Sequence, residues 1–491
     1  MVYNELKSGT DIRGVASDKG GKTVNLTAAA VCDITSAFIV WLCEKTGKRA
    51  DELKIAIGHD SRITAEEIKT NAVSRLLLAG VHIIDCSLSS TPAMFMTTVN
   101  LNCDAAIQIT ASHHPFDRNG LKFFTKEGGL DSSDIAVIVD LANNGVKPDI
   151  ADGKIDKVDF MVQYAADLRG MICRELGKTE ADKPLLGKKI IVDAGNGAGG
   201  FYANNVLAPL GADITGSQFL EPDGMFPNHI PNPENKQAMQ SICDAVIRSN
   251  ADLGIIFDTD VDRAGCVDST GHEINRNRLV ALAAYIASKG NEGATIVTDS
   301  VTSDGLKTYI EKDLGGKHYR YKRGYKNVIN KAIELCEKGV NCPLAIETSG
   351  HAALKENYFL DDGAYLATKI VIELARGNSF EEILSTLKMP AEEKEIRLNI
   401  TETDFRSYGG KVISELQKFA EQNEKCIIAD DNREGIRITT PYGWILLRLS
   451  VHDPVMPLNM ESDEIGGTQK NVEFFKEFFT RFDGLDLSTY C

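Results

Sequence analysis

The sharpest chemical signal in this sequence is the acidic triplet Asp258-x-Asp260-x-Asp262, which directly follows a run of apolar residues. Alternating carboxylates at the end of a buried strand bring their oxygens together, and hard divalent cations prefer oxygen ligands. Three adjacent carboxylates repel one another unless a cation neutralises them, so the pattern predicts a Mg²⁺ site rather than a solvated acidic turn. An EF-hand is excluded, because Arg263 and Ser269 stand where that loop needs glycine and glutamate.

A second polar segment, Thr110–Pro115, follows another run of apolar β-formers. Buried strands that end in small and polar residues usually deliver them to a surface site. Ser112 is a possible nucleophile, while His113, His114 and Lys122 carry groups suited to proton transfer or phosphate binding. The alternative for this segment alone is a strand end followed by a polar turn.

Two further segments carry groups that suit sugars. Glu347, Ser349 and His351 offer hydrogen-bond donors and acceptors for sugar hydroxyls, although a capped helix start is the alternative. Near the N-terminus a glycine-flanked loop holds Arg13, which is either part of a simple turn or a contact to phosphate or sugar.

Cationic residues gather at two other places in this acidic sequence. A basic loop around Lys322 is either a solvated turn or a phosphate site, and we favour the phosphate site. At a predicted strand end, Arg448 and Ser450, with Arg437 nearby, are suited to hold a second phosphate through guanidinium, hydroxyl and backbone N–H groups. Arg263, next to the acidic triplet, is likewise suited to bind a phosphate oxygen.

A glycine-rich turn, Gly195-x-Gly197-x-x-Gly200, follows a predicted strand and fits the dinucleotide-binding fingerprint, with Asp213 or Glu221 as the distal acid. This would make the protein a dehydrogenase. The fingerprint is weak alone, because any tightly packed strand-to-helix turn favours glycine. Nothing else in the sequence indicates hydride chemistry.

The elements that position these residues recur along the chain as strands followed by helices. This alternation predicts three tandem α/β domains with mixed or parallel sheets, at residues 1–150, 151–270 and 271–388. A smaller α+β domain with an antiparallel sheet is predicted at 389–491. Because function gathers at the carboxyl ends of parallel strands, we expect the polar loops to converge on one cleft. Asn119-Gly120 predicts a tight turn.

Composition excludes several other classes of protein. The net charge of −16 argues against a general nucleic-acid or anionic-membrane surface. No signal-peptide pattern is visible, and the most apolar early run, 28–43, is too short to span a bilayer. Eleven cysteines without a C-x-x-C pair favour reduced thiols in the cytoplasm over disulfides or a zinc site.

Four motifs in order, ThrAlaSerHis-x-Pro, Asp-x-Asp-x-Asp-Arg, Glu-x-SerGlyHis and Arg-x-Ser, resemble those of the α-D-phosphohexomutases, the phosphoglucomutase/phosphomannomutase group. The resemblance covers essentially the whole chain and outweighs the dinucleotide interpretation. It implies a four-domain enzyme with a central cleft. Such an enzyme interconverts hexose 1-phosphate and hexose 6-phosphate, of glucose or mannose, through a phosphoserine and a bisphosphorylated sugar.

The resemblance also implies roles for the residues at matching positions. Ser112 carries the phosphoryl group and, with Asp258, Asp260 and Asp262, ligates one Mg²⁺ per chain. The expected sugar-binding residues are Gly324, Tyr325, Glu347, Ser349 and His351, and Arg448 and Ser450 hold the phosphate that does not react. The expected groups for proton transfer and charge stabilisation are Arg13, His113, Lys122 and His351.

The sequence departs from the family pattern at several positions. Val451-His452-Asp453-Pro454 replaces the second half of the usual phosphate loop, which removes a hydroxyl and adds His452 to the expected phosphate-binding residues. This leaves open a preference for an unusual phosphosugar. Val261 stands in the acidic motif where the family often has glycine.

The expected ligands are Mg²⁺, a hexose phosphate substrate and a sugar 1,6-bisphosphate as activator and intermediate. We expect no nucleic-acid or membrane partner, and the sequence leaves monomer and homodimer open. Three alternatives remain: a phosphoglucosamine mutase, a Mg²⁺-dependent sugar phosphatase, and a non-catalytic sugar-phosphate-binding protein on a mutase scaffold.

Overall fold

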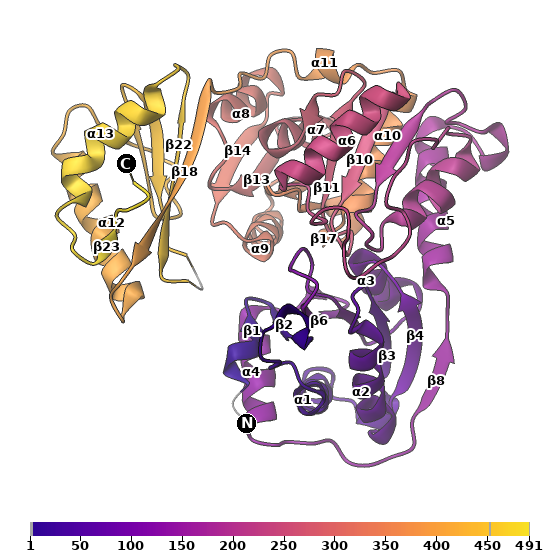
Figure 1. Cartoon of the computed structure of the whole chain (residues 1–491). Coiled ribbons are helices and arrows are strands. Elements are labelled where there is room, and N and C mark those ends of the chain that lie inside the picture. The colour runs from indigo at the N-terminus through magenta and orange to yellow at the C-terminus, as the bar shows by residue number, and fades with distance from the viewer. Residues whose placement is uncertain (1–2, 451–452, 491) are drawn as a thin grey trace. The chain divides into compact units, whose positions relative to one another are not determined.

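The computed structural model describes residues 3–450 and 453–490 of the chain (Figure 1). It divides into two compact units. Unit 1 comprises Met1–Ile286 and Ser349–Ile383, and unit 2 comprises Ala287–Thr348 and Leu384–Cys491. Among residues 3–450 and 453–490, no helix has the length and apolar composition needed to cross a lipid bilayer.

The first sheet of unit 1 has the strand order β1-β2-β6-β5-β3-β4-β8, and β7 pairs with β6. β3 runs parallel to β4 and β5, whereas β6 runs antiparallel to β2 and β5, so the sheet is mixed. The strands are β1 (Lys7–Ser8), β2 (Asp11–Val15), β3 (Lys54–His59), β4 (His82–Leu88), β5 (Ala105–Ile109), β6 (Arg118–Thr125), β7 (Gly128–Gly129) and β8 (Lys154–Lys157).

The tight turn predicted at Asn119-Gly120 is wrong, because both residues lie in β6. A Cβ atom at Gly120 would lie 2.2 Å from the carbonyl oxygen of Ile12 in β2 and 2.8 Å from that of Thr110. Glycine therefore serves close approach between neighbouring backbones at this position. The polar connection from β5 lies earlier, before Arg118.

Helices cover both faces of this sheet. The apolar side chains of α1 (Ala28–Thr46), α2 (Ala65–Leu78) and α4 (Ser132–Asn143) share one core with inward residues of the strands. On the other face lies α3 (Thr91–Asn100), where Phe95 meets Phe124 of β6 edge to face. The Thr27 side chain caps α1 by accepting from the Ala30 N–H, and α1 ends at Gly47 with a left-handed backbone.

The second sheet of unit 1 has the order β12-β11-β10-β9. β9 (Ile190–Asp193) runs parallel to β10 (Leu253–Phe257), and β11 (Ala264–Asp268) and β12 (Glu273–Ile274) continue antiparallel. Its helices are α5 (Phe160–Leu176), α6 (Lys236–Ser249) and α10 (Gly363–Ala375), with α10 packed on α5 and β11. After β9 the chain forms the π-helical segment η5 (Tyr202–Leu207), followed by a 3-10 turn, Ala208–Leu210. The remaining elements around this unit are α7 (Arg276–Ser288), β16 (Ala352–Leu354), β17 (Leu360–Asp361) and α11 (Phe380–Ile383).

Unit 2 contains a parallel sheet segment and a separate antiparallel sheet. β13 (Thr295–Asp299) pairs in parallel with β14 (Lys317–Tyr321) and β15 (Leu344–Ile346), and α8 (Asp304–Thr308) and α9 (Tyr325–Glu337) flank them. The antiparallel sheet has the order β19-β20-β21-β22-β18-β23. Its elements are β18 (Glu392–Ile400), α12 (Phe405–Glu421), β19 (Ile427–Ile428), β20 (Ile436–Thr440), β21 (Gly443–Leu447), β22 (Val455–Ser462), α13 (Gly467–Phe479) and β23 (Leu485–Asp486).

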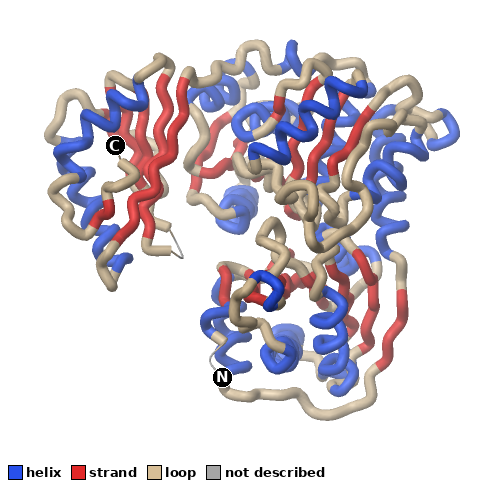
Figure 2. The backbone as a smooth tube through the Cα atoms, in the orientation of Figure 1, coloured by secondary structure: helices blue, strands red, loops and turns tan. Residues whose placement is uncertain are grey.

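The C-terminal sheet has its two helices on one face, as Figure 2 shows. Phe475, Phe478 and Phe479 of α13 pack into a core with the inward residues of the strands. Together with the α/β sheets described above, this confirms the predicted fold class of three α/β domains followed by a smaller domain with an antiparallel sheet.

Glu461 of β22 is a buried acid in this last sheet. Its Oε2 accepts a hydrogen bond of 3.0 Å from Nε1 of Trp444, whose ring lies against the Arg437 guanidinium. Burial raises the pKa of Glu461 from 4.5 to about 7, and the charge of Arg437 and the bond from Trp444 offset this only in part. The folded state therefore binds this proton more tightly than the unfolded chain does.

We expect Glu461→Gln to stabilise unit 2 at neutral pH but not at acid pH. The raised pKa of Glu461 costs the wild type no stability below about pH 4.5, where the group is protonated in both the folded and the unfolded protein. The cost grows with pH until pH exceeds about 7. The difference in free energy of unfolding between variant and wild type should rise by about 3 kcal/mol across this range. Urea titration followed by Trp444 fluorescence, in a Trp41→Phe background, measures it. A pH-independent difference would contradict the assignment.

Candidate active site

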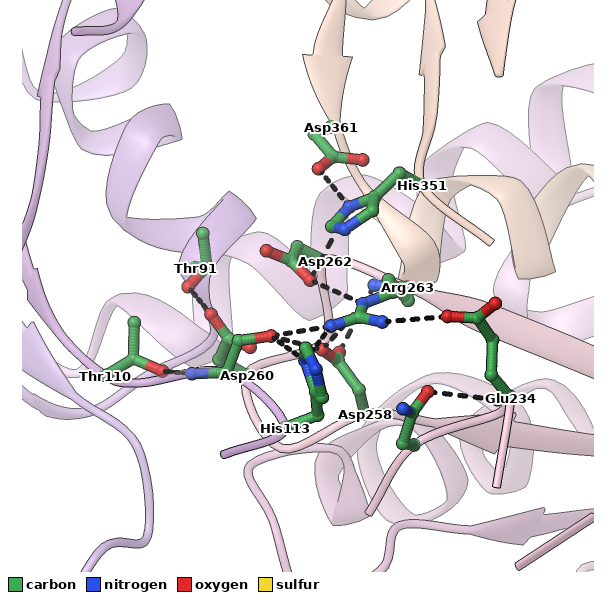
Figure 3. A network of polar contacts seen from close by, with 12 residues as sticks. Thr91, Thr110, His113, Glu234, Asp258, Asp260, Asp262, Arg263, His351 and Asp361 are labelled. Carbon is green, nitrogen blue, oxygen red and sulfur yellow. Dashed lines mark hydrogen bonds and ion pairs between the residues drawn. The ribbon is translucent and has the colours of Figure 1, made fainter. Parts of the chain in front are cut away.

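The acidic loop between β10 and β11 lies in unit 1 and brings its three carboxylates together, as Figure 3 shows. Asp258, Asp260 and Asp262 are fully buried, and one oxygen from each lies within 4.8 Å of the others. Asp260 Oδ1 and Asp262 Oδ1 have no hydrogen-bond partner. Buried oxygens without a donor are costly, and an all-oxygen set of this kind fits Mg²⁺. These three residues would hold the ion.

Neighbouring charges leave the three carboxyl groups in different states. Burial and repulsion from Asp262 raise the pKa of both Asp258 and Asp260. Burial also acts on Asp262, but Lys122, whose Nζ lies 2.6 Å from Asp262 Oδ2, outweighs it and lowers its pKa. The carboxyl groups of Asp258 and Asp260 therefore bind a proton more readily than an ordinary aspartate, whereas that of Asp262 binds it less readily. A divalent cation would favour ionisation of all three.

Val261 in the same loop has a backbone conformation that β-branched residues rarely adopt. Its φ is 69°, and its side chain is fully buried. Such positions cost about 1–3 kcal/mol and persist only where the surroundings hold them. Here the N–H of Gly363, the first residue of α10, donates to the Val261 carbonyl at 3.1 Å. A Cβ at Gly363 would lie 2.5 Å from the carbonyl carbon of Arg263, so glycine allows this contact.

Ser112 lies beside the acidic loop, as the sequence predicted from two separate segments. Its hydroxyl donates to Asp258 Oδ2 at 3.0 Å and accepts from Arg263 Nη2 at 3.0 Å. Its N–H donates to Thr110 Oγ1 at 2.8 Å. Ser112 is buried and has a φ of 49°. A phosphoryl group on this oxygen would face both the carboxylates of the acidic loop and a cation.

Thr91 connects the acidic loop to α3, and sequence reasoning missed it. Its N–H donates to the Asp260 carbonyl at 2.8 Å, and its hydroxyl donates to Asp260 Oδ2. The available signal was Pro92, a residue that favours the first turn of a helix, but a helix start by itself does not indicate a contact to a distant loop.

Two histidines flank the site on opposite sides of Arg263 (Figure 3). Arg263 donates to Nδ1 of His113, and the Arg263 charge together with burial lowers the pKa of His113, so its imidazole is neutral at neutral pH. His351 Nδ1 lies 2.5 Å from Asp361 Oδ2 and 3.8 Å from Asp262 Oδ1. Asp361 orients His351 and was also missed by sequence reasoning.

Arg13 lies in β2 and pairs with Asp11, its Nη2 2.6 Å from Asp11 Oδ2. Its charge contributes to lowering the pKa of both His113 and His114, the latter to about 3 with burial as the main cause. Arg13 therefore lies close enough to the Ser112 loop to affect its charges.

The glycine-rich turn before η5 supports the acidic loop. The N–H of Ala198 donates to the Thr259 carbonyl at 2.8 Å, and a Cβ at Gly197 would lie 2.5 Å from that same oxygen. A Cβ at Gly200 would lie 2.2 Å from the Leu220 carbonyl oxygen. Close backbone packing accounts for these glycines without a dinucleotide.

Unit 2 holds part of the predicted sugar-binding set. The N–H of Gly324, which precedes α9, donates to Glu347 Oε1 at 2.6 Å, and Tyr325 is the first residue of that helix. Ser349 and His351 belong to unit 1.

The predicted phosphate-binding residues of unit 2 differ in their surroundings. Arg448 Nε is buried without a hydrogen-bond partner, and burial, with the charge of Arg323, lowers the pKa of Arg448. The Ser450 hydroxyl accepts from the Asp453 N–H at 3.3 Å. Lys322 is exposed. His452 lies outside the described residues.

Arg437 is buried and bound by protein groups. It donates to the carbonyls of Ser300 and Thr302, pairs with Asp304 at 3.0 Å, and lies on the Trp444 ring. These contacts favour a structural role for Arg437 over the predicted phosphate contact.

Family models for α/β/α domains I, II and III of phosphoglucomutase/phosphomannomutase match residues 5–147, 164–271 and 275–389. A phosphoglucomutase from Neisseria meningitidis is 30% identical over 481 residues, covering 97% of this chain and 96% of that protein. The chain belongs to the phosphoglucomutase/phosphomannomutase family. The resemblance inferred from the four motifs is thereby confirmed.

Other members of the phosphoglucomutase/phosphomannomutase family agree. A phosphomannomutase/phosphoglucomutase from Pseudomonas putida is 29% identical over 479 residues, covering 96% of this chain and 95% of that protein. The X-ray structure of a phosphoglucomutase/phosphomannomutase family protein from Burkholderia thailandensis has 26% identity and a TM-score of 0.82, with 99% of both chains covered. Phosphoglucomutases and phosphomannomutases are isomerases, which confirms the predicted enzyme class.

Proposed function

We propose that this protein interconverts hexose 1-phosphate and hexose 6-phosphate by way of phospho-Ser112 and a sugar 1,6-bisphosphate. The observation that carries this proposal is the position of the Ser112 hydroxyl. It lies 3.0 Å from a carboxylate oxygen of the acidic loop and 3.0 Å from the Arg263 guanidinium. A nucleophilic oxygen between a metal-binding loop and a fixed cation is what phosphoryl transfer requires.

Two half-reactions restore the enzyme in each turnover. Phospho-Ser112 gives its phosphoryl group to the free hydroxyl of the hexose phosphate, whose proton passes to a base. The bisphosphate then presents its other phosphate, and Ser112 takes that group back while the sugar oxygen regains a proton. Arg263 and Lys122 supply positive charge at the transfer position. His351, with Nδ1 held by Asp361, is the group we propose for proton transfer.

Asp258, Asp260 and Asp262, with phospho-Ser112, would hold one Mg²⁺, which when bound neutralises charge on the phosphoryl oxygens. The donor set and its two unpartnered oxygens support this assignment.

Substrate recognition is proposed for the predicted sugar-binding and phosphate-binding residues. Gly324, Tyr325 and Glu347, with Ser349 and His351, are proposed to bind sugar hydroxyls. Arg448 and Ser450, with His452 as a further expected contact, are proposed to hold the phosphate that does not react. The buried, unpartnered Nε of Arg448 supports an anion at that position.

We also propose a cytoplasmic location and a small-molecule substrate rather than a macromolecular one. All ten cysteines in the described part of the chain are free thiols, as expected for a reducing compartment.

The test is conversion of glucose 1-phosphate in the presence of Mg²⁺ and a trace of glucose 1,6-bisphosphate. We expect glucose 6-phosphate to form without release of inorganic phosphate. Mannose and glucosamine 1-phosphates in parallel assays determine the preferred sugar. Release of phosphate in step with substrate loss would indicate a phosphatase instead, and tight binding without turnover would indicate a binding protein.

A further inference from the structure

We propose that Arg62 is a positioning residue that holds the Ser112 loop in the conformation needed for phosphoryl transfer. This inference rests on the proposed role of Ser112. Arg62 follows β3 in unit 1, fifty residues before Ser112 in sequence, and no motif of the sequence analysis included it.

The guanidinium of Arg62 binds three carbonyl groups of the loop that joins β5 to β6 and a fourth at the first residue of β6. Nη1 donates to the carbonyls of Pro115 at 2.7 Å and Arg118 at 2.8 Å. Nη2 donates to the carbonyls of His114 at 2.6 Å and Ser112. Each terminal nitrogen carries two hydrogens, so all four donors are used on this loop and the start of β6.

Arg62 is itself fixed in place. Its side chain is fully buried, and its Nε lies 3.3 Å from Asp60 Oδ2. The same Asp60 oxygen accepts from the Thr110 hydroxyl at 2.7 Å, and that hydroxyl accepts from the Ser112 N–H at 2.8 Å. Arg62 thus binds the Ser112 carbonyl directly, and Asp60 is linked to the Ser112 N–H through the Thr110 hydroxyl.

The Ser112 backbone needs such support. A φ of 49° is uncommon for a residue other than glycine, asparagine or aspartate, and it persists only where surrounding contacts hold it. Without Arg62, the carbonyls of Ser112, His114 and Arg118 would lose this donor, at a cost of about 1–3 kcal/mol for each that stays buried, whereas the Pro115 carbonyl still accepts from the Arg118 N–H at 3.0 Å. The loop would then relax and Ser112 would leave the acidic loop.

Arg62 contacts the Ser112 backbone and not its hydroxyl, so we expect its loss to change kcat rather than substrate binding. Arg62→Lys keeps the charge but loses the planar guanidinium and its four terminal donors, because lysine offers a single ammonium in their place. Displacing a reacting atom by about 1 Å costs about 100-fold in rate. We expect kcat of Arg62→Lys and Arg62→Ala to fall by about that factor, with KM for glucose 1-phosphate within about 3-fold of wild type.

Ile138→Ala is the matched control. Ile138 is a fully buried core residue of α4 in the same unit, and its truncation lowers stability by about 2–5 kcal/mol without touching the Ser112 loop. Its kcat should stay near wild type despite a lower Tm. Added guanidinium ion should restore part of the kcat of Arg62→Ala and leave that of Ile138→Ala unchanged.

Two outcomes overturn the inference. In the first, the Arg62 variants have the same kcat as Ile138→Ala. In the second, KM rises by the same factor as kcat falls, and added guanidinium restores no activity. If Arg62→Ala is recovered unfolded, Arg62→Lys decides by the same criteria. Intact mass after incubation with glucose 1,6-bisphosphate separates this test from that of the proposed function. A wild-type protein that neither gains a phosphoryl group nor turns over refutes the role of Ser112 itself.

Discussion

Ser112→Ala is expected to lower kcat for glucose 1-phosphate by at least about 10³-fold, because removing the nucleophile of a covalent mechanism leaves only binding and charge stabilisation. The variant retains the loop contacts of the Ser112 backbone, so its fold and Tm should change little. Stopped samples analysed for glucose 6-phosphate give kcat. Intact mass after exposure to glucose 1,6-bisphosphate should show one added phosphoryl group on the wild type and none on the variant.

Ser36→Ala provides the comparison for that experiment. Ser36 is a buried serine of α1 whose hydroxyl donates to the Cys32 carbonyl, away from the acidic loop. It should retain wild-type turnover and the added phosphoryl group. Wild-type kcat in Ser112→Ala would refute the phosphoserine assignment, whatever the family relationship.

Asp260→Asn is expected to weaken Mg²⁺ binding by more than about 100-fold, since loss of a ligand should exceed the 10–100-fold cost of losing an outer-sphere partner. Asparagine keeps an oxygen for the Thr91 hydroxyl and removes one negative charge. We expect kcat at fixed Mg²⁺ to fall by about 10³-fold, because metal stabilisation of phosphoryl oxygens is worth several kcal/mol. Titration calorimetry measures the affinity, and Asp268→Asn, whose carboxylate serves a turn with Thr270, should match wild type.

The same titration has a defined pH dependence. Burial and repulsion within the triplet raise the pKa of Asp258 and Asp260, so protons compete with a divalent cation for these groups up to a higher pH than for an ordinary carboxyl. Mg²⁺ affinity should therefore increase as pH rises through the raised pKa values, and binding should release protons. Calorimetry in two buffers of different ionisation enthalpy detects that release. A pH-independent affinity, or an affinity unchanged in Asp260→Asn, would place the metal elsewhere.

The sequence predicted the chemical centre because its members end apolar strands. Asp258 and Ser112 both follow buried β-formers, and each therefore lies at the carboxyl end of its strand. The two strands belong to different sheets, so this rule located each residue but did not by itself predict that the two meet. Residues that only position the reacting groups were not predictable in this way. Arg62, Thr91 and Asp361 bind backbone or support another side chain, and such roles have no fixed spacing to the residues they serve.

Residue types alone also failed to predict one turn and the surroundings of two cations. Asn119-Gly120 has the composition of a turn, yet the Gly120 backbone lies against that of β2 inside the sheet. Lys322 and Arg437 look alike as cations in the sequence, but Lys322 is exposed and Arg437 is buried against Trp444. Whether a cationic side chain can bind a phosphate depends on its burial and on the protein groups that compete for it. The residue type alone does not reveal either.

The contact between Gly363 and Val261 affects the order in which this chain can mature on the ribosome. The chain leaves unit 1 after Ile286 and returns at Ser349, so the helix that braces the strained acidic loop is synthesised about a hundred residues after the loop itself. A nascent chain that has passed Asp262 but has not reached Ser349 contains every carboxylate of the loop but lacks the brace for its left-handed residue. Truncated products would therefore carry the metal-binding residues without their geometry, and competence for the ion would arise late in translation.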